Sequence, residues 1–580
     1  MQFNVEVHSQ IQRLVKKFDG GDPVKRLTLL LLVTTAQFAN AETDGQMRSI
    51  LTNLDYLALA KQSWENGDPI TTRTVNRLIR KANQELNTAP LSVVDSPIVA
   101  PTGDPHEYVS YGAYWWPNPD TPDGIPYVHR DGHINPDNDL DGANLRRLTN
   151  ATVPLSLAYY FTGNEEYADK TAKLIRAWFL DEETYMNPRN EYGLVIPGIR
   201  DGYYDVAGFG NRLPGIFDAA AIIEGSSAWS TEDANALKQW ARDLVEFGAS
   251  TPHGAEQFED PANHGTNFDF LQAFLSTYSE DLEIARDSVQ HYLTNRFPRQ
   301  VAANGSNPFE MRRANNLYYH RYNLERAMDL AAVGESIDID ALDHETNNGG
   351  SLRLQMDYLT PYFLGEKEWD NWPGESFRRR PQFYFTMFRR AAIYFQDPLF
   401  LDAADSLGYK DYSWTNLWYP VSAVEEDLAG DFDTDGFLTV ADIDLFSNRQ
   451  ADRRYFGRYD LNEDEQLTAL DRDILVHNIF RTTYGDADLN GQFSTEDIIQ
   501  VFVAAEYEDD IENNSTWATG DWNGDLDFDT TDLILAGQDG EYERSPQAAV
   551  PEPSGVAMIF LGLVGLLKIR QTHDHTNRSL

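Results

Sequence analysis

Helical hydrophobic periodicity, repeated in segment after segment, is the feature that most constrains how this chain folds. Apolar residues recur every three to four positions, and turns rich in Gly, Pro and Asn separate the segments. Asn164 and Ser230 stand where helix N-caps are expected. The predicted helices span residues 167–178, 234–244, 267–278, 281–297, 317–333, 352–363 and 383–395.

Amphipathic helices that follow one another must each bury an apolar stripe against a neighbour. The strict alternation of apolar and polar residues that is typical of strands is scarce in this part of the chain. We therefore predict an all-α domain, built as an incomplete α/α toroid or barrel, over residues 42–420.

Composition narrows the classes of function. The chain has 580 residues, a net charge of −45 and no cysteine. It therefore contains no disulfide, no thiolate metal site and no cysteine nucleophile. Acidic side chains far outnumber basic ones over residues 421–550. Nucleic acid is excluded as a partner, because phosphate binding needs basic patches.

The N-terminal region has the features of a secretory signal peptide. Lys25 and Arg26 precede an apolar run at 27–35 and an A-x-A site at 39–41. This run is too short to span a bilayer. We expect residues 1–41 to be a signal peptide with an N-terminal extension, from a start codon placed too early, and the mature chain to begin near Glu42.

The C-terminal region, residues 550–570, holds the tripeptide Pro551-Glu552-Pro553, an apolar run at 556–567, and then Lys568 and Arg570. This order resembles the bacterial PEP-CTERM sorting signal. The resemblance implies export, processing at the membrane through this segment, and a periplasmic, cell-surface or extracellular location. An ordinary C-terminal membrane anchor is the alternative.

One long stretch, residues 108–141, is too rich in Pro, Gly, Asn and Asp for a helix. A loop of this length in a compact domain is usually functional. Its aromatic rings suit the C–H faces of pyranose rings, although Trp115 and Trp116 could instead anchor the loop, with one buried and the other exposed. The candidate substrate-binding residues here are Tyr114, Trp115, Trp116, Tyr127 and Arg130.

Two polar stretches carry the groups that uronate chemistry needs. DPANHGT, at 260–266, supplies an amide and an imidazole, and PFEMRRANNLYYH, at 308–320, supplies two guanidiniums and two phenols. These groups can neutralise a sugar carboxylate and move a neighbouring proton. Each stretch alone would be read as a helix cap, a solvated charge or part of a core.

Together with YWWPNP and GIPYVHRDGHINP in the long loop, these stretches resemble the alginate lyase family, polysaccharide lyase family five and its relatives. The resemblance spans residues 108–332. It implies an incomplete α/α barrel with a deep cleft. It also implies β-elimination of a uronate-containing polysaccharide, typically mannuronate-rich alginate.

The family's catalytic residues fall on Asn263, His264, Arg313 and Tyr319. Arg312 and Tyr318 are adjacent, and a shift of one residue turns a helical side chain by about 100°. Which arginine and which tyrosine face the site therefore stays open. Arg312 is kept as a substrate-binding candidate.

The resemblance assigns a role to each group. Asn263 and Arg313 would neutralise the carboxylate, and Tyr319 would remove the C5 proton and protonate O4, with Arg313 favouring its phenolate. His264 would be either an accessory base or a partner for the carboxylate. Glu310 would orient an arginine. No metal is required at this centre.

Two alternative functions remain. A glycoside hydrolase on the same toroid would need two opposed carboxylates, and Asp201, Asp205, Asp260 and Glu310 are available without a marked pair. A catalytically inactive surface protein that binds carbohydrate or acts as a scaffold is the other.

The acidic tail contains four loops with the spacing of a calcium loop. Loops 1 and 3 have Gly436 and Gly491 at position 6, whereas loops 2 and 4 have Glu465 and Leu526. The candidate ligands are Asp431, Asp433, Asp435 and Asp442 in loop 1; Asp460, Asn462, Asp464 and Asp471 in loop 2; Asp486, Asp488, Asn490 and Asp497 in loop 3; and Asp521, Asn523, Asp525 and Asp532 in loop 4.

Asp at position 12 of each loop, in place of Glu, resembles dockerin type I repeats. The resemblance implies two small helical calcium modules, residues 425–480 and 485–540, in which calcium is structural. Their partner would be a cohesin-like or cell-surface protein. Alternatively, the modules form a calcium-rigidified spacer before the sorting signal.

Overall fold

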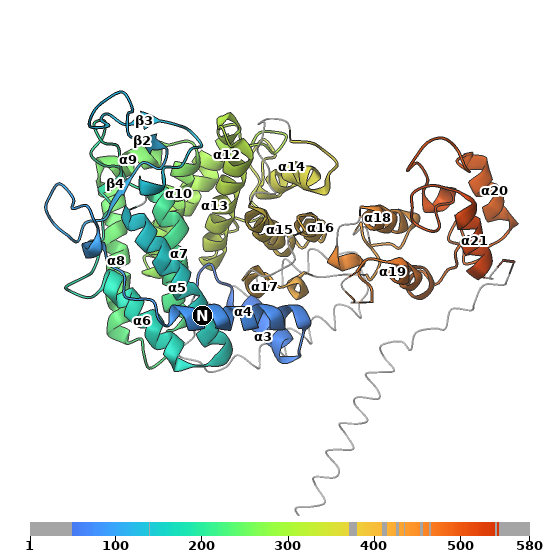
Figure 1. Ribbon diagram of the computed structural model, residues 1–580, viewed down its shortest axis with the longest axis horizontal. Coiled ribbons are helices and arrows are strands. Elements are labelled where there is room, and N and C mark those ends of the chain that lie inside the picture. Colours follow the sequence, from blue (N-terminus) through green and yellow to red (C-terminus); the bar gives the residue numbers. More distant parts are fainter. Residues whose placement is uncertain are drawn as a thin grey trace, which may run out of the picture. The chain divides into compact units, whose positions relative to one another are not determined.

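The computed structural model describes residues 49–543, apart from 139, 370–379, 409–413, 425–427, 434–435, 453–455, 463, 465 and 540–541. The chain divides into two compact units, Met1–Glu426 and Asp427–Leu580 (Figure 1). The predicted signal peptide, the predicted sorting signal and Asp435 lie outside the described residues. In the part of the chain described, no helix is long and apolar enough to cross a membrane.

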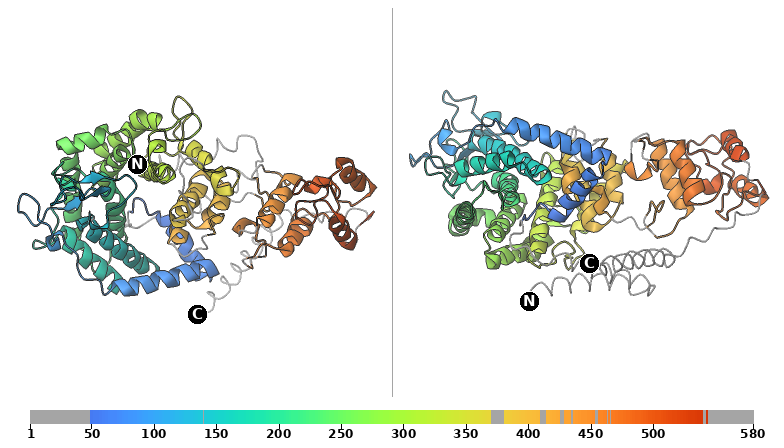
Figure 2. Two further views of the ribbon diagram at one scale, coloured as in Figure 1. Left: turned by 45° about the horizontal axis from the view of Figure 1, so that its top comes forward. Right: turned by 90° about the horizontal axis from the view of Figure 1, so that it is seen from below.

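The first unit is built almost entirely of helices, as its periodicity predicts. Figure 2 shows them following one another around a ring. The helices are α3 (Leu54–Glu65), α4 (Pro69–Glu85), α5 (Leu140–Thr162), α6 (Glu165–Phe179), α7 (Val206–Ile222), α8 (Thr231–Ser250), α9 (Pro252–Glu259), α10 (Asn263–Tyr278), α11 (Leu282–His291), α12 (Phe297–Gln300), α13 (Asn316–Ser336), α14 (Leu352–Leu364), α15 (Pro381–Phe395), α16 (Leu399–Asp405) and α17 (Thr415–Trp418).

Four of these helices pack in series, α5 on α7, α7 on α10 and α10 on α13. Two contacts between α13 and α10 show the direction of these helices. The Tyr322 hydroxyl of α13 donates to Asn267 of α10 at 3.3 Å. About one turn further along both helices, Arg326 lies 4.6 Å from the ring centroid of Phe270. Arg326 also donates to the Gly210 carbonyl of α7 at 2.9 Å. The helices therefore run in parallel, and their N-termini meet at one end of the unit.

The long loop crosses this same end. Its strand β1 (Val109–Tyr111) pairs in parallel with β4 (Tyr192–Val195). Its strands β2 (Trp115–Trp116) and β3 (Val128–His129) form a short antiparallel ribbon. The stretch predicted to be non-helical thus has a little strand structure of its own.

Helix starts follow their caps. Asn164 accepts from the backbone of Glu166, and Ser230 forms a capping box with Asp233. The helix expected over 281–297 is interrupted, because α11 passes into a π-helical turn at Tyr292–Arg296 before α12 begins. Single π turns of this kind often occur at functional sites.

The second unit repeats a loop followed by a helix. Each Asp at position 12 accepts a backbone N–H from position 2 of its own loop; in loop 1, Phe432 donates to Asp442 at 2.7 Å. One hydrophobic core, including Phe446, Tyr459, Trp517 and Trp522, runs through all four repeats. The helices are α18 (Val440–Ala451), α19 (Ala469–Asp473), α20 (Thr495–Ala504) and α21 (Thr530–Asp539).

Candidate active site

Two buried side chains hold the loop before α10 in place. Arg296 donates to the carbonyls of Phe258 and Asp260 and to Asp269, and Gln300 donates to the Pro261 carbonyl at 2.9 Å. Gly265 is required here, because a β-carbon would collide with the Arg296 guanidinium and the Asp260 carbonyl. The π turn that carries Arg296 thus helps to fix the Asn-His pair.

Asn263 is the first residue of α10, and Ala262 occupies the cap position. The backbone N–H and the Nδ2 of Asn263 both donate to Glu310 Oε1 at 2.9 Å. The ordinary reading of Asn263 as a helix cap is therefore wrong. The expectation that Glu310 orients an arginine is also wrong in its partner, since this buried carboxylate holds Asn263 instead.

The imidazole of His264 is oriented by Gln257, a fully buried residue of α9. Nδ1 lies 3.0 Å from Gln257 Oε1, and an amide oxygen only accepts, so Nδ1 carries the proton. Burial lowers the pKa of His264, with Asp260 and Asp205 opposing and Arg313 and Arg200 adding to the shift. The neutral ring therefore keeps a lone pair on Nε2.

Arg313 lies against the ring of Tyr319, with Cζ 3.8 Å from the ring centroid. Its Nη2 donates to Asp131 Oδ1 at 2.9 Å, which ties the long loop to the start of α13. Burial would raise the pKa of Asp131, but the bond and charge of Arg313 lower it. The neighbouring Arg312 is exposed and packs over Phe309 instead.

Tyr319 is 8% exposed, and its hydroxyl bonds to the Tyr114 hydroxyl of the long loop. Burial and Tyr114 raise its pKa, and Arg313 lowers it by less. At neutral pH the free protein therefore holds a protonated phenol. Arg313 acts in the expected direction, but the expectation of a favoured phenolate is wrong because desolvation outweighs one nearby guanidinium.

The neighbours of Tyr319 on α13 stack on other aromatic rings. The Tyr318 ring stacks on Tyr322 with an interplanar angle of 1°. His320 is fully buried and stacks on Tyr358, and burial lowers its pKa to about 4. Tyr319 contacts both Arg313 and the Tyr114 hydroxyl of the long loop.

The aromatic residues of the long loop pack against one another. Trp115 lies 5.1 Å from His129 between ring centroids, and Arg130 lies 5.3 Å from the ring of Trp116. Both tryptophans are half-buried, so the expectation of one buried and one exposed ring is wrong. Tyr127 packs edge-on against Tyr111.

The four predicted catalytic residues are thus brought to one end of the parallel helices. Arg313 touches Tyr319 and its charge acts on His264, while Glu310, three residues before Arg313, holds Asn263. Sequence reasoning missed Gln257 and Asp131. Asp131 lies within the stretch GIPYVHRDGHINP but was not singled out, because its partner Arg313 is 182 residues away. No motif marked Gln257.

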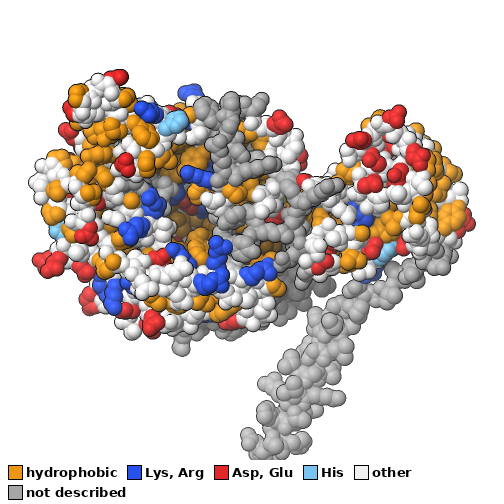
Figure 3. Space-filling model, in the orientation of Figure 1, with side chains coloured by type: hydrophobic (Ala, Val, Ile, Leu, Met, Phe, Trp, Pro, Cys, Tyr) orange, Lys and Arg blue, Asp and Glu red, His pale blue; other side chains and the backbone are white. Residues whose placement is uncertain are grey.

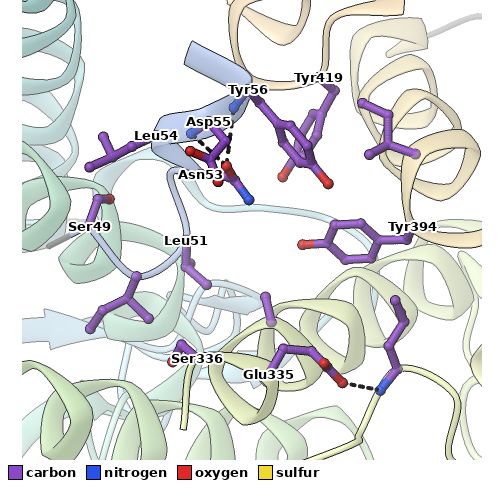
Figure 4. A pocket seen from close by; sticks show the side chains of 14 residues that line it. Ser49, Leu51, Asn53, Leu54, Asp55, Tyr56, Glu335, Ser336, Tyr394 and Tyr419 are labelled. Atoms are coloured by element: carbon purple, nitrogen blue, oxygen red, sulfur yellow. Dashed lines mark hydrogen bonds between the residues drawn. The ribbon is translucent and has the colours of Figure 1, made fainter. Parts of the chain in front are cut away.

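A separate cavity of about 440 Å³ lies at the far end of α13, beside Glu335 and Ser336 (Figure 4). Tyr56, Tyr394 and Tyr419 also line it. Tyr319 stands 16 residues earlier on the same helix, roughly 24 Å away at the rise of an α-helix. This cavity is therefore distinct from the predicted catalytic residues.

In the second unit, two loops bring three carboxylates within 4.8 Å of one another. These triads are Asp431, Asp433 and Asp442 of loop 1, and Asp486, Asp488 and Asp497 of loop 3. Both could hold a metal ion. Among the described residues of loops 2 and 4, no such triad is found.

Comparisons with known proteins agree with this geometry. The family model described as alginate lyase matches residues 92–369. An alginate lyase from Bacteroides ovatus superimposes with a TM-score of 0.61 at 29% identity, covering 65% of this chain and all of that one. Alginate lyase A1-III from Sphingomonas species A1 is 14% identical, with a TM-score of 0.44, over 64% of this chain and 97% of that one. No curated protein matches the chain.

The helical fold and these matches define the protein as a polysaccharide lyase. Residues 92–369 match the model of the alginate lyase family.

Proposed function

We propose that the first unit, as an incomplete α/α toroid, cleaves a uronate polysaccharide by β-elimination, with Tyr319 acting on the C5 proton and on O4. The observation that carries this assignment is the contact of Tyr319 with Arg313 beside the Asn263–His264 pair. A phenol, a guanidinium, an amide and an imidazole are then available to one sugar ring.

Asn263 and Arg313 would neutralise the carboxylate of the substrate. Arg313 already binds one carboxylate, since its Nη2 donates to Asp131 Oδ1 at 2.9 Å, and we propose that it binds the uronate carboxylate in the same way. The N-termini of α7, α10 and α13 meet at the same end and add positive potential. Together these groups would stabilise the charge that develops when C5 loses its proton.

Proton transfer follows from the protonation states. Tyr319 is a protonated phenol at rest and is suited to protonating the departing O4. His264 is neutral, with its Nε2 lone pair free of the Gln257 bond. As the accessory base it would take the hydroxyl proton of Tyr319 while Tyr319 takes the C5 proton. Tyr319 would then give a proton to O4, and His264 would return its proton to Tyr319. Of the two roles that the sequence left open for His264, we propose the accessory base.

We propose mannuronate-rich alginate as the substrate, on the strength of the family match. Alginate is a polyanion, and the whole chain is strongly acidic. The acidic side chains are unevenly distributed, however, so the net charge does not exclude this substrate. Figure 3 shows Lys and Arg side chains around a hollow on one face of the first unit. Arg313 and Arg200 both act on His264 electrostatically, against larger effects of Asp260 and Asp205.

Incubation of the full chain with polymannuronate, polyguluronate and a glucuronate polymer tests the function. We expect absorbance of the unsaturated uronate product to rise fastest with polymannuronate. New reducing ends without that absorbance would indicate a glycoside hydrolase. Neither signal with any polymer would favour an inactive surface protein.

For the second unit we propose structural calcium in dockerin-like loops. Carboxylate oxygens are the donors that Ca²⁺ prefers, and three of them crowded together repel one another without a cation. Loops 1 and 3 fit this requirement. Chelation should lower the melting temperature of this unit, and an unchanged transition would refute the proposal. A cohesin-like or cell-surface protein is the proposed partner.

We also propose that the protein is exported by the signal at 1–41 and sorted by the segment at 550–570. The motifs of both segments support this proposal. Sequencing the N-terminus of the protein from the cell surface or medium tests it. A chain that stays in the cytoplasm with both ends intact would contradict it.

A further inference from the structure

We infer that Arg472 supplies the positive charge of loop 4, so that calcium binds firmly at loops 1 and 3 but not at loop 4. This inference rests on the proposed calcium function of the second unit. It distinguishes among four loops whose spacing is the same. The argument comes from where the Arg472 side chain lies.

Arg472 belongs to α19, the helix that follows loop 2, and is 1% exposed. Its Nη2 donates to the Ser447 hydroxyl at 3.0 Å and to Gln450 Oε1 at 2.8 Å, both on α18. The guanidinium then reaches the backbone of Gly524. A β-carbon on Gly524 would collide with Nη2, so glycine leaves the space that the guanidinium fills.

Gly524 is part of loop 4, between the expected ligands Asn523 and Asp525. Asp521, the first expected ligand, is fully buried, and its Oδ2 has no hydrogen-bond partner among the described residues. The Nη1 of Arg472 is likewise buried without one in the part of the chain described. The Gly524 N–H donates to Asp521 Oδ1 at 2.8 Å, and the Arg472 guanidinium lies against Gly524. The two buried groups of opposite charge thus lie on either side of one residue, which lowers the cost of burying each.

The same neighbours appear in the electrostatics of Arg472. Asp521, Asp532 and Asp525 attract the buried guanidinium electrostatically. All three are ligand candidates of loop 4. A divalent cation in this loop would be repelled by the guanidinium through a low-dielectric interior, where such interactions are strong.

Loops 1 and 3 differ from loop 4 in two independent ways. Each has Asp at positions 1, 3 and 12, and these carboxylates lie within 4.8 Å of one another, whereas loop 4 has Asn523 at position 3. Each also has glycine at position 6 in the left-handed conformation, with φ of 88° at Gly436 and 89° at Gly491. In loop 4 the same position is Leu526 at φ 74°, which a side chain rarely adopts.

Native mass spectrometry of the full chain tests the inference by counting bound calcium ions after chelation and return of Ca²⁺ alone at about 10 μM, within the range of calcium-sensing sites. Asp486→Asn in loop 3 should remove one ion. The matched variant Asp521→Asn in loop 4 should remove none. Arg472→Gln should allow one more ion than the unmodified chain binds.

The outcomes separate this inference from the calcium proposal. Loss of one ion in Asp521→Asn, as in Asp486→Asn, would overturn the role of Arg472 while leaving calcium binding intact. Absence of bound calcium in the unmodified chain would overturn both. If Arg472→Gln fails to fold, the comparison of Asp486→Asn with Asp521→Asn decides the question alone.

Discussion

Arg313 stacks on the face of Tyr319 with its Cζ 3.8 Å from the ring centroid, while its Nη2 binds Asp131 at 2.9 Å. The guanidinium thus joins the tyrosine of α13 to the long loop. It is also the cation that opposes the raised pKa of that tyrosine. These two contacts distinguish Arg313 from its neighbour Arg312.

Replacement of Arg313 should therefore be far more damaging than replacement of Arg312. Arg313→Gln removes the charge that neutralises the uronate carboxylate, and we expect kcat to fall by about 10²–10³-fold, as when one oxyanion-stabilising donor is lost. Arg312→Gln is the matched control, because Arg312 is exposed. Steady-state rates on polymannuronate measure both. Equal losses in the two variants would contradict the assignment.

The pH dependence of activity should report the environment of His264. Burial lowers its pKa, so the neutral base persists below the ordinary histidine value of about 6.5. The acidic limb of kcat/KM should therefore lie below that pH. Gln257→Glu places a negative charge at Nδ1 and should move the limb upward.

Gln257→Leu provides the control for this experiment, because it removes the hydrogen bond without adding charge. It should lower kcat by misorienting the ring and should leave the limb below about 6.5. An acidic limb that does not move in Gln257→Glu would show that His264 does not titrate in the catalytic cycle.

Because of His320, the folded state should lose stability as the pH is lowered. Its folded pKa is about 4, depressed by burial, whereas the unfolded chain has the ordinary value of about 6.5. The unfolded state binds a proton first as pH falls, so stability present above about pH 6.5 is lost toward pH 4. The difference corresponds to roughly 3 kcal/mol at most.

His320→Phe keeps the stacking on Tyr358 but cannot titrate. Urea unfolding at several pH values should show a shallower loss of stability between pH 6.5 and 4 in this variant than in the unmodified chain. An identical pH profile in the two proteins would contradict the prediction.

The sequence predicts α6 and α8, because each has a strong apolar period and a polar cap. It did not mark α5 and α7, two helices that pack in series with α10 and α13. Ser230 and Asn164 begin their helices as expected. It could not choose between Arg312 and Arg313 or between Tyr318 and Tyr319. Adjacent residues carry the same chemistry there, and only the turn entering α13 decides which side chain faces the site.

Other features depend on contacts that no local pattern encodes. Gln257 meets His264 across a helix junction, and Asp131 meets Arg313 from 182 residues away. The raised pKa of Tyr319 depends on burial under the long loop, which sequence spacing does not measure. The partner of Glu310 was missed for the same reason.

The most direct test of the central claim compares Tyr319→Phe with Tyr318→Phe. Each variant removes one hydroxyl from neighbouring rings. Tyr319 bonds to Tyr114 and packs on Arg313, whereas the Tyr318 ring stacks on Tyr322. Formation of unsaturated uronate from polymannuronate is followed by absorbance, with binding measured by calorimetry.

We predict that Tyr319→Phe loses turnover by about 10²–10⁴-fold, the usual contribution of a proton-transfer group, while still binding the polymer. Tyr318→Phe should retain near-normal turnover. Near-normal turnover in Tyr319→Phe would contradict the account and assign the proton transfer to another residue.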